Sequence, residues 1–130
     1  RLFNPERTAH FLGPRLFPKP EQAQLREMFI AQWAQNDPQA YRAAMRALVG
    51  WSVLDRVSRI ACPTLVISGD RDYTPPATKA AYVAMMPNAR LVVLADSGHA
   101  TPIDQAGRFN DCVLAFLASV AAPERDEERV

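Results

Sequence analysis

Two short apolar runs separated by a helix-length segment constrain this chain more than any other feature. The first run covers residues 64–68 (TLVIS) and the second covers residues 91–94 (LVVL). Uninterrupted runs of this kind, rich in β-branched residues, are typical of strands covered on both faces in a parallel sheet. The small side chains between them predict a helix over residues 77–86. Because strands joined through a helix run parallel, the pattern predicts an α/β fold.

A carboxylate and an imidazole follow the two predicted strands. Asp72 lies in the loop GDRDYTPP after the first strand, and His99 lies in the loop ADSGHATP after the second. Parallel strands place both loops at the carboxyl edge of the sheet, where open α/β folds bind ligands. A carboxylate can orient a histidine and stabilise its protonated form, while the second ring nitrogen takes a proton from a nucleophile. The spacing therefore predicts an acid and base pair.

The same loops offer alternatives. Asp70 is a second candidate for the acid, and Asp96 is expected to brace the histidine loop rather than to take part in chemistry. A purely structural histidine is the alternative for His99. A metal site built from Asp70, Asp72 and His99 has suitable ligand types, but no further ligand is placed to complete it. We therefore expect no metal.

The first part of the chain is predicted to be helical. Residues 1–19 mix large apolar side chains with proline and glycine, which predicts short helical pieces and turns. Apolar residues at helical spacing predict one helix over residues 20–36 and another over residues 37–50, joined by a short turn into a hairpin. A connector over residues 51–60 then brings the chain to the sheet.

Aromatic and methionine side chains of this hairpin are candidates for substrate binding. They are Trp33, Tyr41 and Met45. Ordinary packing between two helices accounts for the same spacing, so both interpretations stay open.

The organisation that follows is a partial, doubly wound parallel sheet of two βα units preceded by a helical cap hairpin. We assign residues 1–51 to a cap or lid segment, residues 52–122 to the carboxy-terminal part of an α/β core, and residues 123–130 to a charged tail. A final helix is expected from about Pro102. Two parallel strands that are apolar on both faces need neighbours. Together with the lack of an initiator methionine at Arg1, this predicts the second half of a larger domain.

Charge and hydropathy exclude several classes of partner. Fifteen basic and fourteen acidic residues leave a net charge of +1, and the charges are scattered. Neither nucleic acid nor a membrane is therefore an expected partner, and no apolar run approaches the roughly 20 residues of a membrane helix. With no signal peptide at its start, a cytoplasmic location is the default expectation.

Two segments resemble a known family. PTLVISGDRD and MPNARLVVLADSGHATPIDQAGRFNDCVLAFL are similar to the carboxy-terminal half of the α/β-hydrolase family, strongly over residues 55–118. Over residues 20–51 the weaker similarity is to the cap inserted before the acid-bearing strand. The resemblance implies that Asp72 is the catalytic acid and His99 the base.

The resemblance also marks three positions after the histidine. Asp104 and Phe109 match residues that hold structural positions in the family. Ala106 replaces a proline that is common there, and we expect this departure to affect only the start of the final helix.

The resemblance implies a Ser-Asp-His triad, without cofactor, that cleaves an ester, a lactone or a related small acyl substrate. The family serine lies on a G-x-S-x-G elbow ahead of the acid, and no serine of this chain has such flanking glycines. The expected partner is therefore the missing amino-terminal half of the same fold, and the chain alone is expected to be inactive. The alternatives are an aspartate nucleophile, as in dehalogenases and epoxide hydrolases, or a non-catalytic ligand-binding protein.

Overall fold

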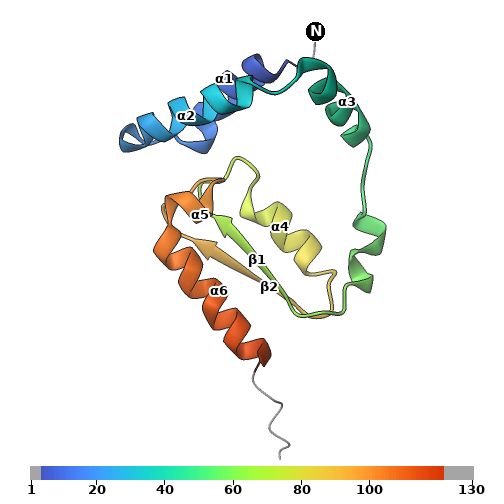
Figure 1. Ribbon diagram of the computed structural model, residues 1–130. Helices are drawn as coiled ribbons and strands as arrows, with labels where there is room; N and C mark the ends of the chain where they lie inside the picture. The colour runs from blue at the N-terminus through green and yellow to red at the C-terminus, as the bar shows by residue number, and fades with distance from the viewer. Residues whose placement is uncertain (1–3, 122–130) are drawn as a thin grey trace, which may run out of the picture.

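A computed structural model describes residues 4–121 (Figure 1). Its elements follow in chain order: α1 (Pro5–Leu16), the 3₁₀ turn η1 (Pro20–Gln22), α2 (Ala23–Ala34), α3 (Pro38–Leu48), the 3₁₀ turn η2 (Leu54–Arg59), β1 (Thr64–Gly69), α4 (Pro76–Val83), β2 (Ala89–Leu94), α5 (Thr101–Asp104) and α6 (Ala106–Ala121). The predicted tail over residues 123–130 lies outside the described residues. Among those described, no helix is both long and apolar enough to cross a membrane.

The two strands form a parallel pair, which confirms the predicted α/β class. Their register runs from Thr64 opposite Ala89 to Gly69 opposite Leu94. Figure 1 shows α4 on one side of the strand pair and α6 on the other, and both helices contact both strands. The two βα units are therefore present, and both connecting loops leave the sheet at its carboxyl edge.

Residues 5–16 form one continuous helix, so the prediction of short helical pieces and turns was wrong. The Asn4 side chain accepts a hydrogen bond of 2.9 Å from the backbone N–H of Arg7, and Pro5 occupies the first turn. Pro14 lies inside the last turns of the helix without ending it. The packing of α1 along α2 stabilises the helix by more than Pro14 destabilises it.

The helical hairpin before the sheet consists of α1 and α2, which pack closely along each other. Gly13 permits this approach, because a Cβ at that position would lie 2.9 Å from Ile30 Cδ1. The helix α3 touches α2 mainly through the edge-to-face contact of Trp33 and Tyr41, whose ring centroids are 6.3 Å apart. The close hairpin thus lies earlier in the chain than the pair predicted over residues 20–50.

The predicted final helix is divided in two. Gln105 leaves helical geometry with φ −133° and ψ 50°, which separates α5 from α6. The second helix begins at Ala106. The residue that replaces the usual proline is thus the first residue of α6.

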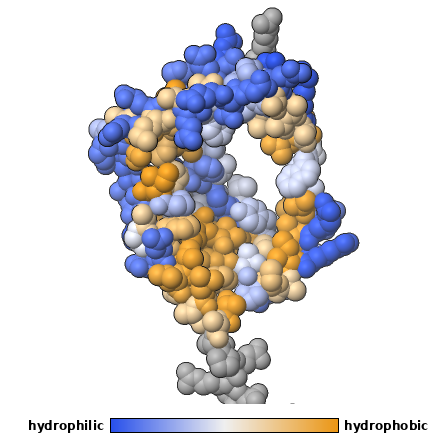
Figure 2. All heavy atoms as spheres, in the orientation of Figure 1, coloured by the Kyte–Doolittle hydropathy of each residue, from blue (hydrophilic) through white to orange (hydrophobic). Residues whose placement is uncertain are grey.

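The apolar surface of the α/β part is only partly covered by the described residues. Val93 on β2 is 43% exposed, and Ile103 and Leu117 are each 54% exposed. Figure 2 shows the apolar side chains gathered over the strands and α6, whereas the surface of α1 and α2 is largely polar. Full cover of both strand faces, expected from their sequences, is absent within residues 4–121.

The helices α1 and α2 lie over the carboxyl edge of the sheet. In Figure 1, α1 and α2 stand beyond the arrowheads of both strands, and the segment containing η2 returns the chain to the opposite edge. The α1–α2 hairpin therefore faces the two loops that carry Asp72 and His99.

Candidate active site

Asp72 and His99 meet in the structure. The His99 ring nitrogen Nδ1 lies 2.9 Å from Asp72 Oδ1. The two residues are 27 positions apart, and the parallel register brings their loops together at one edge. The distance is that of a hydrogen bond, so the predicted contact between acid and imidazole is present.

The Asp72 carboxylate is almost fully buried and well supplied with donors. Its side chain is 4% exposed. Thr74 donates to Oδ1 through its backbone N–H at 2.8 Å and its hydroxyl at 2.9 Å, and Lys79 Nζ donates to Oδ2 at 2.9 Å. Burial would raise the pKa of Asp72, but these donors and His99 outweigh it and lower the pKa from 3.8 to about 2. Asp72 is therefore ionised at neutral pH.

His99 remains partly open to solvent. Its side chain is 41% exposed, and its ring lies against Tyr73 with centroids 4.4 Å apart. Among the described residues no partner is recorded for Nε2. With Nδ1–H donating to Asp72, this second nitrogen is an acceptor that faces away from the carboxylate.

The other loop acids occupy supporting positions. Asp70 Oδ1 accepts the backbone N–H of Ser97 at 3.0 Å. Backbone N–H groups of Ser97 and Asp96 lower the pKa of Asp70. Asp96 has φ 58° and pairs with Arg71 at 2.8 Å. Asp72, and not Asp70, therefore contacts the histidine, while Asp96 braces its loop as predicted.

Asp104 fixes the backbone beside the histidine. Its side chain is 1% exposed, and Oδ2 accepts the Gly98 N–H at 2.6 Å. Oδ1 accepts from Gln22 Nε2 at 2.6 Å and lies 3.3 Å from Lys19 Nζ. Burial would raise the pKa of Asp104, but the Gly98 N–H, Lys19 and Gln22 hold it below its ordinary value.

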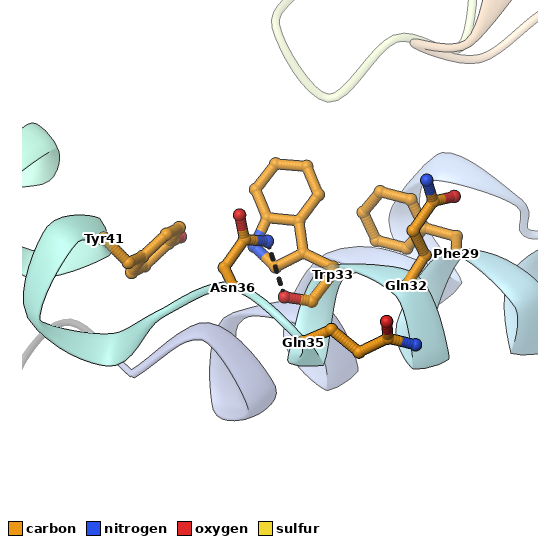
Figure 3. Close-up of a pocket in the computed structure, with 6 residues that line it drawn as sticks. All are labelled: Phe29, Gln32, Trp33, Gln35, Asn36 and Tyr41. Carbon is orange, nitrogen blue, oxygen red and sulfur yellow. Dashed lines mark hydrogen bonds between the residues drawn. The ribbon is translucent and has the colours of Figure 1, made fainter.

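The cap candidates line a pocket only in part. The pocket has a volume of about 460 Å³. Figure 3 shows Phe29 and Trp33 projecting from α2 and Tyr41 facing them from α3. Gln32, Gln35 and Asn36 complete its lining. Met45, the third candidate, lies outside this lining. In this view the aromatic rings stand on the side of α2 toward the loops of the α/β part.

None of the chain's five serines places its hydroxyl in contact with His99, as a nucleophile would. Ser97 is the nearest in sequence, but its side chain is fully buried, and Ser68 is 1% exposed. No serine hydroxyl among the described residues is recorded as a partner of the histidine. Within residues 4–121, no three His, Cys, Asp or Glu side chains are grouped to hold a metal ion.

Several residues that build the site were not identified from the sequence. Thr74 follows Asp72 by two positions, and an aspartate commonly accepts hydrogen bonds from the residue two positions later. This contact could therefore have been predicted from the sequence. Lys79 lies on α4, and Lys19 and Gln22 lie between α1 and α2. The contacts of these three residues with the site could not be predicted from their positions in the sequence, because they depend on how the helices pack.

Comparison with known proteins gives the family. A sequence model described as "Alpha/beta hydrolase family" matches residues 1–112. Polyketide synthase ThaQ of Burkholderia thailandensis is 38% identical over 72 residues, which cover 55% of this chain and 4% of that protein. The pimeloyl-[acyl-carrier protein] methyl ester esterase of Xanthomonas axonopodis pv. citri is 31% identical over 97 residues, covering 74% of this chain and 38% of the esterase.

Solved structures agree with this result. The enol-lactonase of Burkholderia xenovorans LB400 superposes with a TM-score of 0.78 and 25% identity, over 88% of this chain and 45% of the lactonase chain. The chain thus spans less than half the length of each of these three proteins. The family match covers most of the sequence, and the parallel βα units carry their acid and histidine at one sheet edge. The chain belongs to the alpha/beta hydrolase family.

Proposed function

We propose that the whole protein is a serine hydrolase that cleaves an ester, a lactone or a related acyl substrate. The observation that carries this proposal is the hydrogen bond between Asp72 Oδ1 and His99 Nδ1, which leaves Nε2 to act as a base. The nucleophilic serine would come from a part of the protein outside this chain.

The expected reaction is acyl transfer in two steps. The serine oxygen attacks the substrate carbonyl while its proton passes to His99 Nε2, and the resulting tetrahedral intermediate expels the alcohol, which takes that proton. Water then attacks the acyl carbon and gives a proton to His99, the bond between the acyl carbon and the serine oxygen breaks, and the serine takes that proton as the carboxylic acid leaves. Asp72 stays ionised throughout, because its donors hold its pKa at about 2, and it stabilises the imidazolium.

The relatives support an acyl substrate. One similar protein is named as a methyl ester esterase and another as an enol-lactonase. Both names describe cleavage of a carbon–oxygen bond at an acyl carbon, which is the reaction that an acid, a histidine and a serine perform together.

The cap would supply binding surface for the substrate. Trp33 and Tyr41 line the pocket of about 460 Å³ together with Phe29. Aromatic walls with a few amide groups suit an apolar acyl or alcohol moiety. Met45 is the weaker candidate, since it does not reach this lining.

The partner that completes the fold would be the remaining part of the same α/β domain. Exposed apolar side chains support this proposal, since large exposed patches mark surfaces that another element covers. They lie on β2 and α6: Val93, Leu114, Leu117 and Val120.

The test is substitution in the full-length protein with ester and lactone substrates. His99→Ala is expected to lower kcat by at least about 10⁴-fold, and Asp72→Asn by about 10³- to 10⁴-fold, because the histidine loses its base or its tautomer. Asp70→Asn is the matched control and is expected to retain most activity. Turnover that survives His99→Ala would remove this histidine from the mechanism.

The nucleophile is tested separately. A fluorophosphonate probe is expected to label the full-length protein and not residues 1–130. Hydrolysis without labelling would instead favour an aspartate nucleophile, and binding of a substrate analogue without hydrolysis would favour a ligand-binding protein.

A further inference from the structure

The loop that carries His99 is held from two sides. On the side of the sheet, the Arg71 N–H donates to Ser97 O at 2.9 Å, and Gly69 lies against the same loop. On the opposite side lies the α1–α2 connector, residues 17–22, which belongs to the cap. The second set of contacts joins segments about 80 positions apart in sequence.

Lys19 is the centre of the contacts from the connector. Its ammonium group donates to the backbone oxygen of Asp96 at 2.8 Å and to Asp96 Oδ2 at 3.1 Å, and lies 3.3 Å from Asp104 Oδ1. These two residues flank His99 in the sequence on either side. One cation of the cap therefore ties together both ends of the histidine loop.

Asp104 transmits this contact to the residue next to the histidine. Its buried carboxylate takes the Gly98 N–H on one oxygen and the cap donors Lys19 and Gln22 on the other. Within residues 4–121, Lys19 is the sole cationic side chain that pairs with Asp104. A buried carboxylate without its cation is strongly destabilised, so loss of the connector would force the Asp104 side chain and the Gly98 backbone to move.

We propose that Lys19 and Asp104 are positioning residues that make the placement of His99 depend on the docking of the α1–α2 connector. The inference rests on the proposed function, because it gives His99 a reacting role. The cap then has a second task besides covering the substrate. When the connector is seated, the loop holds His99 against Asp72, and when the connector moves away, the base loses its orientation.

The test is Lys19→Met in the full-length protein, which keeps the apolar stem and removes the donors. We expect kcat to fall about 10- to 100-fold, the cost of a displaced catalytic group, with KM changed less than about threefold. The proton NMR signal of His99 Nδ1–H, shifted downfield by Asp72 and identified by its absence in His99→Ala, should disappear or broaden. Lys19→Arg should restore both in part.

Arg59→Met is the matched control, because it removes one positive charge from an exposed residue of η2 with no side-chain partner among the described residues. It should leave the NMR signal and kcat unchanged. A folded Lys19→Met protein with wild-type signal and kcat would overturn the proposal. If Lys19→Met does not fold, Gln22→Met serves as the test, because it removes one donor to Asp104 and leaves the positive charge of Lys19 in place. An unchanged NMR signal in Gln22→Met would also overturn the proposal.

The NMR signal separates this inference from the proposed function, since it needs no turnover. Absence of hydrolysis in the wild-type protein would count against the proposed function alone. The dependence of the His99 signal on Lys19 would still decide the coupling between cap and histidine loop.

Discussion

At the scale of single residues, Asp72 shows how a buried charge is kept ionised. Burial alone would raise the pKa of the carboxylate, but four donor groups from Thr74, Lys79 and His99 converge on its two oxygens. Charge-assisted hydrogen bonds of this kind are stronger than neutral ones. Groups of the chain itself therefore hold the carboxylate ionised and in contact with His99.

This arrangement predicts a loss of stability in acid. Because the folded pKa of Asp72 is about 2 and its ordinary value is 3.8, the ionised group stabilises the folded state above about pH 4. This contribution, about 2 kcal/mol, is lost as the pH falls toward 2. Urea unfolding of the full-length protein between pH 5 and pH 2 should show the decrease.

The comparison variant is Asp72→Asn, whose unfolding free energy should fall less steeply over the same pH range. Asp111→Asn, at an exposed position of α6 without a partner among the described residues, should keep the wild-type slope. Equal slopes for Asp72→Asn and the wild type would show that the carboxylate does not have its expected low pKa.

At the scale of elements, the end of β1 and the histidine loop approach each other without intervening side chains. A Cβ at Gly69 would overlap the backbone oxygens of Ser97 and Gly98. The close approach lets the loop after β1 and the loop after β2 share hydrogen bonds, including Arg71 N–H to Ser97 O at 2.9 Å. Glycine is required here for space and not for an unusual backbone angle.

Gly69→Ala should therefore separate the two loops. We expect the unfolding free energy to fall by about 1–3 kcal/mol, as for other overpacked sites, and kcat to fall because His99 moves relative to Asp72. Gly107→Ala is the matched control: nothing lies within 4 Å of its Cβ position in α6, and it should stabilise the helix by about 0.5 kcal/mol. Chemical denaturation of both variants measures these changes, and equal stability would contradict the steric argument.

At the scale of the whole molecule, the described residues bring Asp72 and His99 together below a helical hairpin, but they contain few fully buried apolar side chains. Most of the buried hydrophobic residues lie in or next to α1 and α3, namely Ala9, Leu16, Phe17 and Tyr41, and the others are Val83 and Leu94 in the α/β part. The strands and α6 expose apolar groups instead (Figure 2). The α/β part thus presents surface that further elements of the fold would cover.

Residues 1–130 alone are therefore predicted to show no hydrolysis of esters or lactones. Co-expression with the remaining part of the domain should restore activity, because it supplies the nucleophile and covers the exposed apolar surface. The same co-expression with His99→Ala in this chain is the control and should stay inactive. Esterase activity from purified residues 1–130 alone would contradict the prediction.

Much of the fold was predictable because it depends on short-range patterns. The apolar runs around Val66 and Val92 predicted both strands, and a helix between them fixed their parallel direction, which in turn predicted that Asp72 and His99 would meet. The extent of α1 was not predictable, because the close packing of Gly13 against Ile30 in α2 outweighs the proline in its last turns.

The sequence by itself thus determined the α/β class, the two loops that follow the strands and the positions of Asp72 and His99 within them. Only the tertiary structure decided what surrounds this pair. Lys79 on α4 contacts Asp72 in the loop before that helix. Lys19 contacts Asp104 from a segment about 80 residues away. The physical reason is that periodicity reports which face of an element is apolar, whereas a contact between distant polar side chains depends on how whole elements pack.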